Sequence, residues 1–372
     1  MSLRESRDAR REEAIYGDPR TLRALLARIH SLVERLPRRL TLMEVCGTHT
    51  HAIGTAGLRR LLPPQIRLVS GPGCPVCVTP VGYLDHAEAL LARPETTVCT
   101  FGDLYRVPSS RGSLERCVAT GGRVEIVYSA RDALVHAESH PDRHVVFLAI
   151  GFETTTPTIA AALAEAEQRG IENFSILPGN KTIPPALHAL AGDRDVQLDG
   201  LLLPGHVAVV SGADAFDFLG EHYRLPAVVT GFTPADVARA VLELVTQHVE
   251  RRAQVINRYA RVVSGPGNRV AQELVARYFE PADADWRGLG TIPGSGLALR
   301  PRWRERDASR WAVALPEPRE PAGCRCGEVL RGVIDPPECG LFGTACTPAT
   351  PVGACMVSSE GSCAAWYRHE RA

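Results

Sequence analysis

The sequence lacks an excess of either charge, an export signal and any apolar run long enough to cross a membrane. Its 42 lysine and arginine residues are balanced by 42 aspartate and glutamate residues, which gives a formal net charge of zero. A chain without a basic surplus is poorly suited to phosphate backbones or anionic lipid. We therefore expect neither nucleic acid nor a membrane as a partner. The first residues are highly charged and contain no apolar signal-peptide core, so we expect a cytoplasmic protein.

The sequence also lacks the phosphate-binding motif GxxxxGKS/T, which excludes an ordinary P-loop ATPase. A length of 372 residues with 45% hydrophobic and 23% charged residues is enough for a buried core and for two or three domains. What the sequence has in unusual number is cysteine, with 11 residues. A disulfide framework is not expected in a cytoplasmic chain, because thiols are kept reduced there unless they are catalytic or bind metal.

The cysteines fall into two groups, which predicts two separate sulfur sites. Three lie early in the chain and two follow, and after a long gap six lie within about forty residues near the C-terminus. In chain order they are Cys46, Cys74, Cys77, Cys99, Cys117, Cys324, Cys326, Cys339, Cys346, Cys355 and Cys363.

Short apolar runs that end in glycine or cysteine turns alternate with helical stretches, a pattern typical of a parallel sheet with helices on its faces. A second series of such runs begins at His144, and both series open with a strand, a threonine-rich turn and a helix. We therefore predict an α/β fold of two similar parallel-sheet domains followed by a loop-rich and helical C-terminal domain. The predicted boundaries are 1–140, 141–250 and 251–372, with a charged extension over roughly the first fifteen residues.

Two helix starts are clear in the sequence. Asp18 and Pro19 form a cap and first-position pair before apolar residues that keep helical spacing as far as Leu36. Thr233 and Asp236 flank a proline in the same way before a second amphipathic stretch.

The early cysteines lie directly after predicted strands, where the turns of an open α/β sheet converge on a crevice. Cys46 is followed by His49, and Cys74 and Cys77 have the CxxC spacing that either holds a metal or alternates between dithiol and disulfide. Asp103 is expected in the same crevice.

Several other residues have an ordinary structural explanation. Cys99 lies inside an apolar strand and is expected to be a core residue, and Cys117 has no partner spacing. For Glu153, capping a helix explains its position as well as a site does. His51 and His206 are left undecided.

The six C-terminal cysteines indicate a metal centre. Four thiolates suit either zinc or a [4Fe–4S] cluster, and the spread spacing favours the cluster because zinc ligands usually come in close CxxC pairs. Two thiols would then remain as a redox pair beside it, since a cluster passes single electrons and a disulfide needs two. With few apolar runs, this region is expected to need bound metal to fold.

The segments CGTHTH, GPGCPVCVTP, TFGDLYRVP, GFETTTP, PGHV and GFTPAD, followed by this order of cysteines, resemble the HypD family of hydrogenase maturation proteins along nearly the whole chain. The resemblance implies a scaffold for the iron, cyanide and carbonyl part of the [NiFe]-hydrogenase cofactor, an Fe(CN)2CO intermediate. It implies a chain that is monomeric alone, that works with a HypC-type chaperone and that receives cyanide from a HypE-type donor.

The resemblance also implies roles for individual cysteines. Cys46 would hold the iron jointly with the chaperone, and Cys74 and Cys77 would be further iron ligands or a redox pair. Cys326 and Cys355 would be left as an exchangeable pair. We hypothesise that this pair passes electrons from the cluster to Cys74 and Cys77, and that His49 and Asp103 supply protons or orient the thiolates. The implied cluster ligands are Cys324, Cys339, Cys346 and Cys363.

Two other classes remain open from the residues. One is an iron–sulfur thiol–disulfide oxidoreductase that acts on a diffusible substrate through Cys74 and Cys77. The other is a structural zinc protein whose C-terminal region is a folding clip. Whether the chain is an enzyme or a scaffold with redox chemistry is also open.

Overall fold

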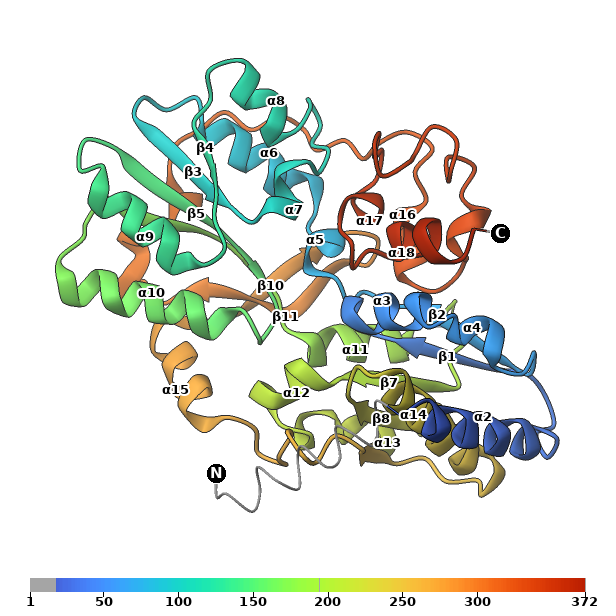
Figure 1. The fold of residues 1–372 in the computed structure, drawn as a ribbon. Helices are drawn as coiled ribbons and strands as arrows, with labels where there is room; N and C mark the ends of the chain where they lie inside the picture. The colour runs from blue at the N-terminus through green and yellow to red at the C-terminus, as the bar shows by residue number, and fades with distance from the viewer. Residues whose placement is uncertain (1–17, 194, 372) are drawn as a thin grey trace.

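The computed structural model describes residues 18–193 and 195–371, so the charged extension lies outside the described residues. Two parallel sheets with helices on their faces form most of this structure (Figure 1). Sheet A has the strand order β2-β1-β7-β8-β9 and sheet B the order β4-β3-β5-β6. The strands of sheet A are β1 (Leu40–Glu44), β2 (Ile66–Ser70), β7 (Gly200–Pro204), β8 (Ala227–Thr230) and β9 (Val255–Asn257). Those of sheet B are β3 (Thr96–Thr100), β4 (Val124–Ile126), β5 (His144–Gly151) and β6 (Phe174–Asn180).

Both helix starts predicted from the sequence are confirmed. Helix α2 (Pro19–Val33) begins after Asp18, whose side chain accepts a hydrogen bond from the backbone N–H of Arg20. Helix α14 (Pro234–Val249) begins with a reciprocal capping box between Thr233 and Asp236. The two helices pack on each other and, with sheet A, enclose one apolar core.

The remaining helices are shorter and mostly connect strands. Near sheet A lie α3 (Gly47–Thr55), α4 (Leu58–Leu61), α12 (Gly205–Ser211), η1 (Asp214–Phe216) and α13 (Phe218–Glu221). Around sheet B lie α6 (Val81–Leu90), α7 (Gly102–Tyr105), α8 (Leu114–Ala119), α9 (Ala130–Ser139) and α10 (Thr156–Arg169). Helices α5 (Pro75–Val78) and α11 (Ile183–Gly192) lie where the chain passes between the two sheets.

The two α/β halves are confirmed, but the strands do not divide at the predicted boundaries. The chain builds β1 and β2 in sheet A, crosses to build all of sheet B, and then returns to sheet A for β7 to β9. The boundary predicted at residue 140 falls inside sheet B, because β3 pairs with both β4 and β5. The boundary predicted at residue 250 precedes β9, which still pairs with β8. An apolar run indicates a strand but not which strand it pairs with. The sequence pattern therefore does not reveal that the chain returns to sheet A at β7.

The C-terminal third adds a hairpin and a region with many short turns. Helix α15 (Arg269–Tyr278) leads into the antiparallel strands β10 (Phe279–Trp286) and β11 (Gly290–Leu299), and β11 packs beside β6. The short helices η2 (Pro301–Arg306) and η3 (Ala308–Arg310) follow. The tail, residues 324–371, contains α16 (Cys326–Leu330), η4 (Pro336–Glu338), α17 (Ala354–Val357) and α18 (Ser362–His369). No helix in the described ranges is both long and apolar enough to span a membrane.

The tail packs on both halves of the molecule. Helix α18 contacts α3, and α17 contacts α5, as the red and blue segments of Figure 1 show. Arg59 of α4 adds an ion pair to Glu370, just beyond α18, and its guanidinium lies over the ring of Trp366. The cysteines of the tail are therefore held close to the loops that carry the early cysteines.

Replacing Leu202 of β7 with alanine should lower the free energy of unfolding by about 2–5 kcal/mol, the usual cost of a cavity at a buried leucine. Leu202 is fully buried in the core between sheet A and its helices. Leu61, which is 44% exposed at the end of α4, is the matched control. Its alanine variant should change stability by less than about 0.5 kcal/mol. Urea unfolding followed by circular dichroism measures both variants, and equal losses would contradict a central place for β7.

Candidate functional site

The strand order of each sheet creates a crevice at one point of its carboxyl edge. In sheet A the chain runs outward from β1 to β2 on one side and from β7 to β8 on the other, so the loops after β1 and β7 diverge. In sheet B the same divergence occurs after β3 and β5. Such switch points are where open α/β sheets bind ligands. Cys46 follows β1 and Asp103 follows β3, so each lies beside a switch point.

Cys46 is held in place by a buried carboxylic acid that the sequence analysis did not select. The backbone N–H of Cys46 donates to Glu44 Oε2 at 3.2 Å, and the Thr50 hydroxyl donates to Glu44 Oε1. Glu44 is fully buried, and burial raises its pKa to about 7 despite these hydrogen bonds. A signal was present in the sequence, since an acidic residue ends an otherwise apolar strand directly before the cysteine loop.

The Cys46 loop lies directly on the loop that leads to Cys74. The backbone N–H of Gly47 donates to the carbonyl of Gly73 at 3.0 Å. A Cβ at Gly73 would lie 2.2 Å from the backbone nitrogen of Cys46, so any larger residue would force the two loops apart. The glycines of these motifs therefore bring Cys46 and Cys74 into one site.

The thiol of Cys46 lies in surroundings that favour its neutral form. Burial raises the pKa of Cys46 to about 12, and the carboxylates of Glu360 and Glu44 act in the same direction. Backbone N–H groups of the first turn of α3 oppose this rise. The residue as a whole still keeps some exposed surface. A cation that replaces the proton would relieve the cost of burial, because it would neutralise the buried thiolate.

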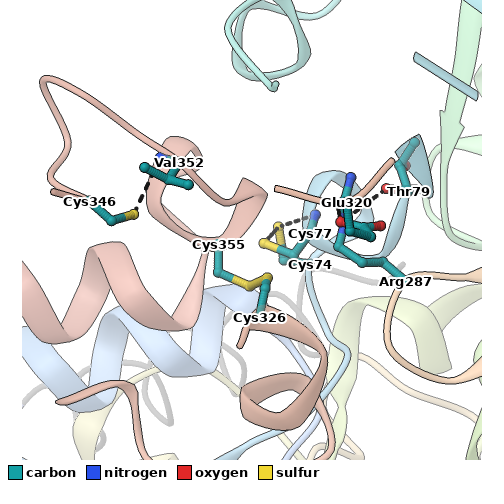
Figure 2. Close-up of a disulfide and its surroundings, with 9 residues drawn as sticks. All are labelled: Cys74, Cys77, Thr79, Arg287, Glu320, Cys326, Cys346, Val352 and Cys355. Atoms are coloured by element: carbon teal, nitrogen blue, oxygen red, sulfur yellow. Dashed lines mark hydrogen bonds and ion pairs between the residues drawn. A yellow bond between two sulfur atoms is a disulfide. The ribbon is translucent and has the colours of Figure 1, made fainter. Parts of the chain in front are cut away.

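Cys74 and Cys77, here called the front pair, adjoin each other at the start of α5. Their sulfur atoms are 2.7 Å apart, and the backbone N–H of Cys77 points to Cys74 Sγ at 3.4 Å (Figure 2). Both residues are buried, and burial raises the pKa of Cys77 well above its ordinary value. This separation suits a pair that alternates between dithiol and disulfide, whereas two thiolates that share a metal ion would lie further apart.

His49 is fully buried behind Cys46. Its Nε2 lies 3.0 Å from the carbonyl oxygen of Gly231, and its ring stacks on Phe232 with the centroids 4.6 Å apart. His206 stacks on the other face of Phe232 at 3.8 Å. Burial lowers the pKa of His49 to about 4, so its imidazole is neutral at pH 7, and its Nδ1 is buried without a hydrogen-bond partner among the described residues. This environment suits orientation of the loop more than donation of a proton.

Asp103 lies against the tail. Its Oδ2 accepts a hydrogen bond from the buried Ser358 hydroxyl at 2.6 Å. Two residues further on, Glu360 Oε1 accepts one from the Thr48 hydroxyl at 2.9 Å. One tail segment therefore connects the switch-point loops of both sheets. The sequence analysis missed Ser358 and Glu360 because they lie among the C-terminal cysteines, far from the motifs that they contact.

Glu153 does not join the cysteine site. Its Oε1 accepts from the backbone N–H of Ile183, the first residue of α11, so the helix-capping explanation describes its contact. Its other oxygen is buried without a described partner, and burial raises the pKa of Glu153 to about 7. The carboxyl group lines a separate cavity between α12, α15 and the hairpin.

Cys99 and Cys117, which had an ordinary structural explanation, and one undecided histidine lie outside the cysteine site. Cys99 is fully buried in β3, which confirms it as a core residue, and Cys117 is a free, half-buried cysteine of α8. His51 meets His369 of α18 edge to face, with ring centroids 5.4 Å apart.

Four free cysteines of the tail line a single pocket, here called the tail pocket, together with the apolar side chains of Val329, Leu341, Phe342 and Met356. Burial raises the pKa of Cys363, and the other three thiols raise it further because they face the same space. The described residues contain no group of three or more histidine, cysteine, aspartate or glutamate side chains arranged for a single metal ion. Four thiolates on an apolar wall are the usual ligand set of a [4Fe–4S] cluster, so the residues present fit this group. They are Cys324, Cys339, Cys346 and Cys363.

Cys326 and Cys355, here called the tail pair, form a disulfide with their Cα atoms 6.4 Å apart. Figure 2 shows this disulfide between Cys346 of the tail pocket and the front pair. Helix α17, which carries Cys355, packs on α5, which carries Cys77. The structure thus places the tail pocket, the tail pair and the front pair on neighbouring elements, and the loop of Cys46 contacts the loop of the front pair through its backbone.

The family model that matches the chain is that of HypD, described as the hydrogenase formation hypA family, and it covers residues 20–370. The hydrogenase maturation factor HypD of Rhizobium leguminosarum bv. viciae is 48% identical over 338 residues, 88% of each chain. The factor of the same name from Azotobacter vinelandii is 45% identical over 364 residues, 96% of each chain, and that of Escherichia coli K12 is 45% identical over 338 residues, 90% of each chain. The chain therefore belongs to the HypD family of hydrogenase maturation factors, as its motifs predicted.

Proposed function

We propose that this chain is a scaffold on which the iron centre of a [NiFe] hydrogenase receives its cyanide and carbonyl ligands. The chain acts in the cytoplasm, is a monomer alone, and works with a HypC-type chaperone and a HypE-type cyanide donor. The observation that carries the proposal is the packing of α17, which carries Cys355, on α5, which carries Cys77, together with the close approach of Gly73 to the backbone of Cys46. This arrangement supports a path of sulfur atoms from the tail pocket to a metal-binding loop.

The iron is the cargo of this scaffold, held by Cys46 and either ligated or reduced by the front pair. Soft thiolates are the ligands that retain iron in its low-valent, cyanide-binding state. Cys46 keeps exposed surface, which leaves room for a ligand supplied by the chaperone. Glu44 accepts a hydrogen bond from the backbone N–H of Cys46 and so fixes the position of this residue before any metal binds.

The tail pocket holds the resident cofactor through Cys324, Cys339, Cys346 and Cys363. A bound [4Fe–4S] cluster supplies electrons one at a time to the neighbouring thiols. The tail pair stores two electrons as a dithiol and passes them to the front pair by thiol–disulfide exchange. Release of cyanide from a donor thiocyanate consumes two electrons and leaves a thiol behind, which matches what the front pair delivers.

His49 and Asp103 act in this scheme by holding loops in place. The neutral imidazole of His49 ties the Cys46 helix to Gly231, and Asp103 holds Ser358 of the tail. Of the two roles that the sequence left open, orientation is the one that these contacts support.

Replacement of Cys46 by alanine should remove the cyanide and carbonyl infrared bands from protein purified anaerobically with the chaperone. Bound iron should fall by about tenfold or more, since even residues that only support a metal ligand contribute 10–100-fold to affinity. Cys117→Ala is the control, because this half-buried cysteine lies outside the site. Iron analysis and infrared spectra measure the effect, and a Cys46 variant that kept cyanide-ligated iron would exclude this cysteine as a ligand.

Replacement of both Cys326 and Cys355 by serine should leave iron bound but free of cyanide. The tail pocket keeps its four thiols in this variant, so the brown colour of the cluster should persist. Without the tail pair, however, the two electrons needed for cyanide release no longer reach Cys74 and Cys77 together. Cyanide bands of wild-type intensity in the double variant would mean that the relay does not exist. A colourless wild-type protein containing zinc would instead favour the structural zinc alternative.

A further inference from the structure

The turn between β10 and β11 inserts a buried arginine beside the front pair. The backbone N–H of Arg287 donates to the carbonyl of Val78 at 2.9 Å, and its Nε donates to the carbonyl of Thr79 at 3.0 Å. These carbonyls lie at the carboxyl end of α5, the helix whose N-terminal cap is Cys74. Figure 2 shows Thr79 beside Arg287. Arg287 therefore fixes the carboxyl end of the helix that carries Cys77.

The same turn is wedged against the tail pair. A Cβ at Gly288 would lie 2.3 Å from the Cα of Gly327, and a Cβ at Gly327 would lie 2.7 Å from the Cα of Gly288. Gly327 directly follows Cys326 in α16. Two glycine backbones in contact leave no space for a side chain at either position. The hairpin turn thus touches the helices of both cysteine pairs.

The charge of Arg287 is only partly neutralised. Its side chain is 3% exposed and pairs with Glu320, whose own side chain is 56% exposed. Its second terminal nitrogen is buried and has no hydrogen-bond partner among the described residues. A guanidinium remains protonated in proteins, so a positive charge persists in this low-dielectric place. The hydrogen bonds to Val78 and Thr79 hold this charge beside the residues that directly follow Cys77, and the contact of Gly288 with Gly327 holds the same turn against the residue that follows Cys326.

We propose that Arg287 is a positioning residue for electron transfer between the tail and the front pair, and that its buried charge stabilises negative charge on sulfur at both places. This inference rests on the relay of the proposed function. In that relay a thiolate of the reduced tail pair attacks the oxidised front pair, breaks its disulfide and forms a mixed disulfide. The second tail thiol then releases the front pair. Two electrons and two protons move to the front pair, and the tail pair becomes a disulfide.

The charge matters because each attack and each departure places a negative sulfur in a buried region. A cluster bound to four thiolates also carries negative charge, and a nearby cation favours its reduced form. A residue that merely capped α5 would affect stability but neither the exchange rate nor the reduction potential. Those two quantities therefore separate the proposed role from a structural one.

The test compares full-length, cluster-loaded protein with Arg287→Gln and Arg287→Lys variants. Alkylation followed by mass spectrometry measures the exchange between the tail pair and the front pair, and an EPR-monitored titration measures the cluster potential. In R287Q we expect exchange to be at least tenfold slower and the cluster to be tenfold harder to reduce, which is about 59 mV for one electron. R287K keeps the charge but loses the Nε contact to Thr79, so it should restore the potential and only part of the rate.

Arg131→Gln is the control. Arg131 of α9 lies beside sheet B, away from the cysteines, and its side chain is 66% exposed and pairs with Glu165, so its removal should change neither quantity. Glu320→Gln provides a second variant that removes only the exposed partner of Arg287. It should shift the potential upward.

If the wild-type protein exchanges electrons between the two pairs and R287Q has the same exchange rate and cluster potential, the role of Arg287 is overturned and the relay is not. If R287Q does not fold or load its cluster, an unchanged potential in E320Q overturns it instead. A wild-type protein that shows no exchange between the two pairs would overturn the relay itself, and with it the proposed function.

Discussion

The pairing of β1 with β7 is the constraint on which the rest of the structure depends. These strands are separated by the whole of sheet B in the sequence, yet Leu42 is aligned with Gly200 in one parallel sheet. Their contact joins the strands of sheet A built before sheet B to those built after it, and it creates the crevice beyond Glu44. The loop that carries the front pair follows β2 and therefore leaves the same carboxyl edge of sheet A. Without this long-range pairing, Cys46 would end an isolated two-stranded unit with no site around it.

Close backbone approach, more than charge, assembles the sulfur path on this framework. Gly73 meets Cys46, Gly47 meets Glu360 and Gly288 meets Gly327, each at a distance that a side chain would prevent. Buried polar groups then fix the directions of the loops, at the cost of removing them from water. Glu44 and His49 show this cost, because burial raises the pKa of Glu44 and lowers that of His49, and both shifts favour the neutral form. This cost is consistent with the proposed function, in which the position of the Cys46 loop decides whether iron binds.

The sequence predicted the features that are local and missed those that depend on distant contacts. The caps of α2 and α14 and the α/β class follow from local patterns, and the structure agrees with them. The division into domains differed because strand pairing is not encoded in a run of apolar residues. Glu360 and Arg287 were missed for a related reason, since each acts on a loop some two hundred or more residues away. A buried arginine in a hairpin turn looks like an ordinary surface residue in the sequence alone.

The burial of the cysteine residues is also consistent with the proposed relay. Cys46 and Cys324, at the two ends, keep some accessible surface, whereas the front pair and the tail pair between them are buried. Thiol–disulfide exchange requires access by the attacking thiolate, so burial protects both pairs from small thiols and oxidants in solution. A buried pair can then exchange only with another pair that the fold places beside it. The cost is that buried thiolates form reluctantly, and in the proposed relay the fixed charge of Arg287 beside the front pair would lower this cost.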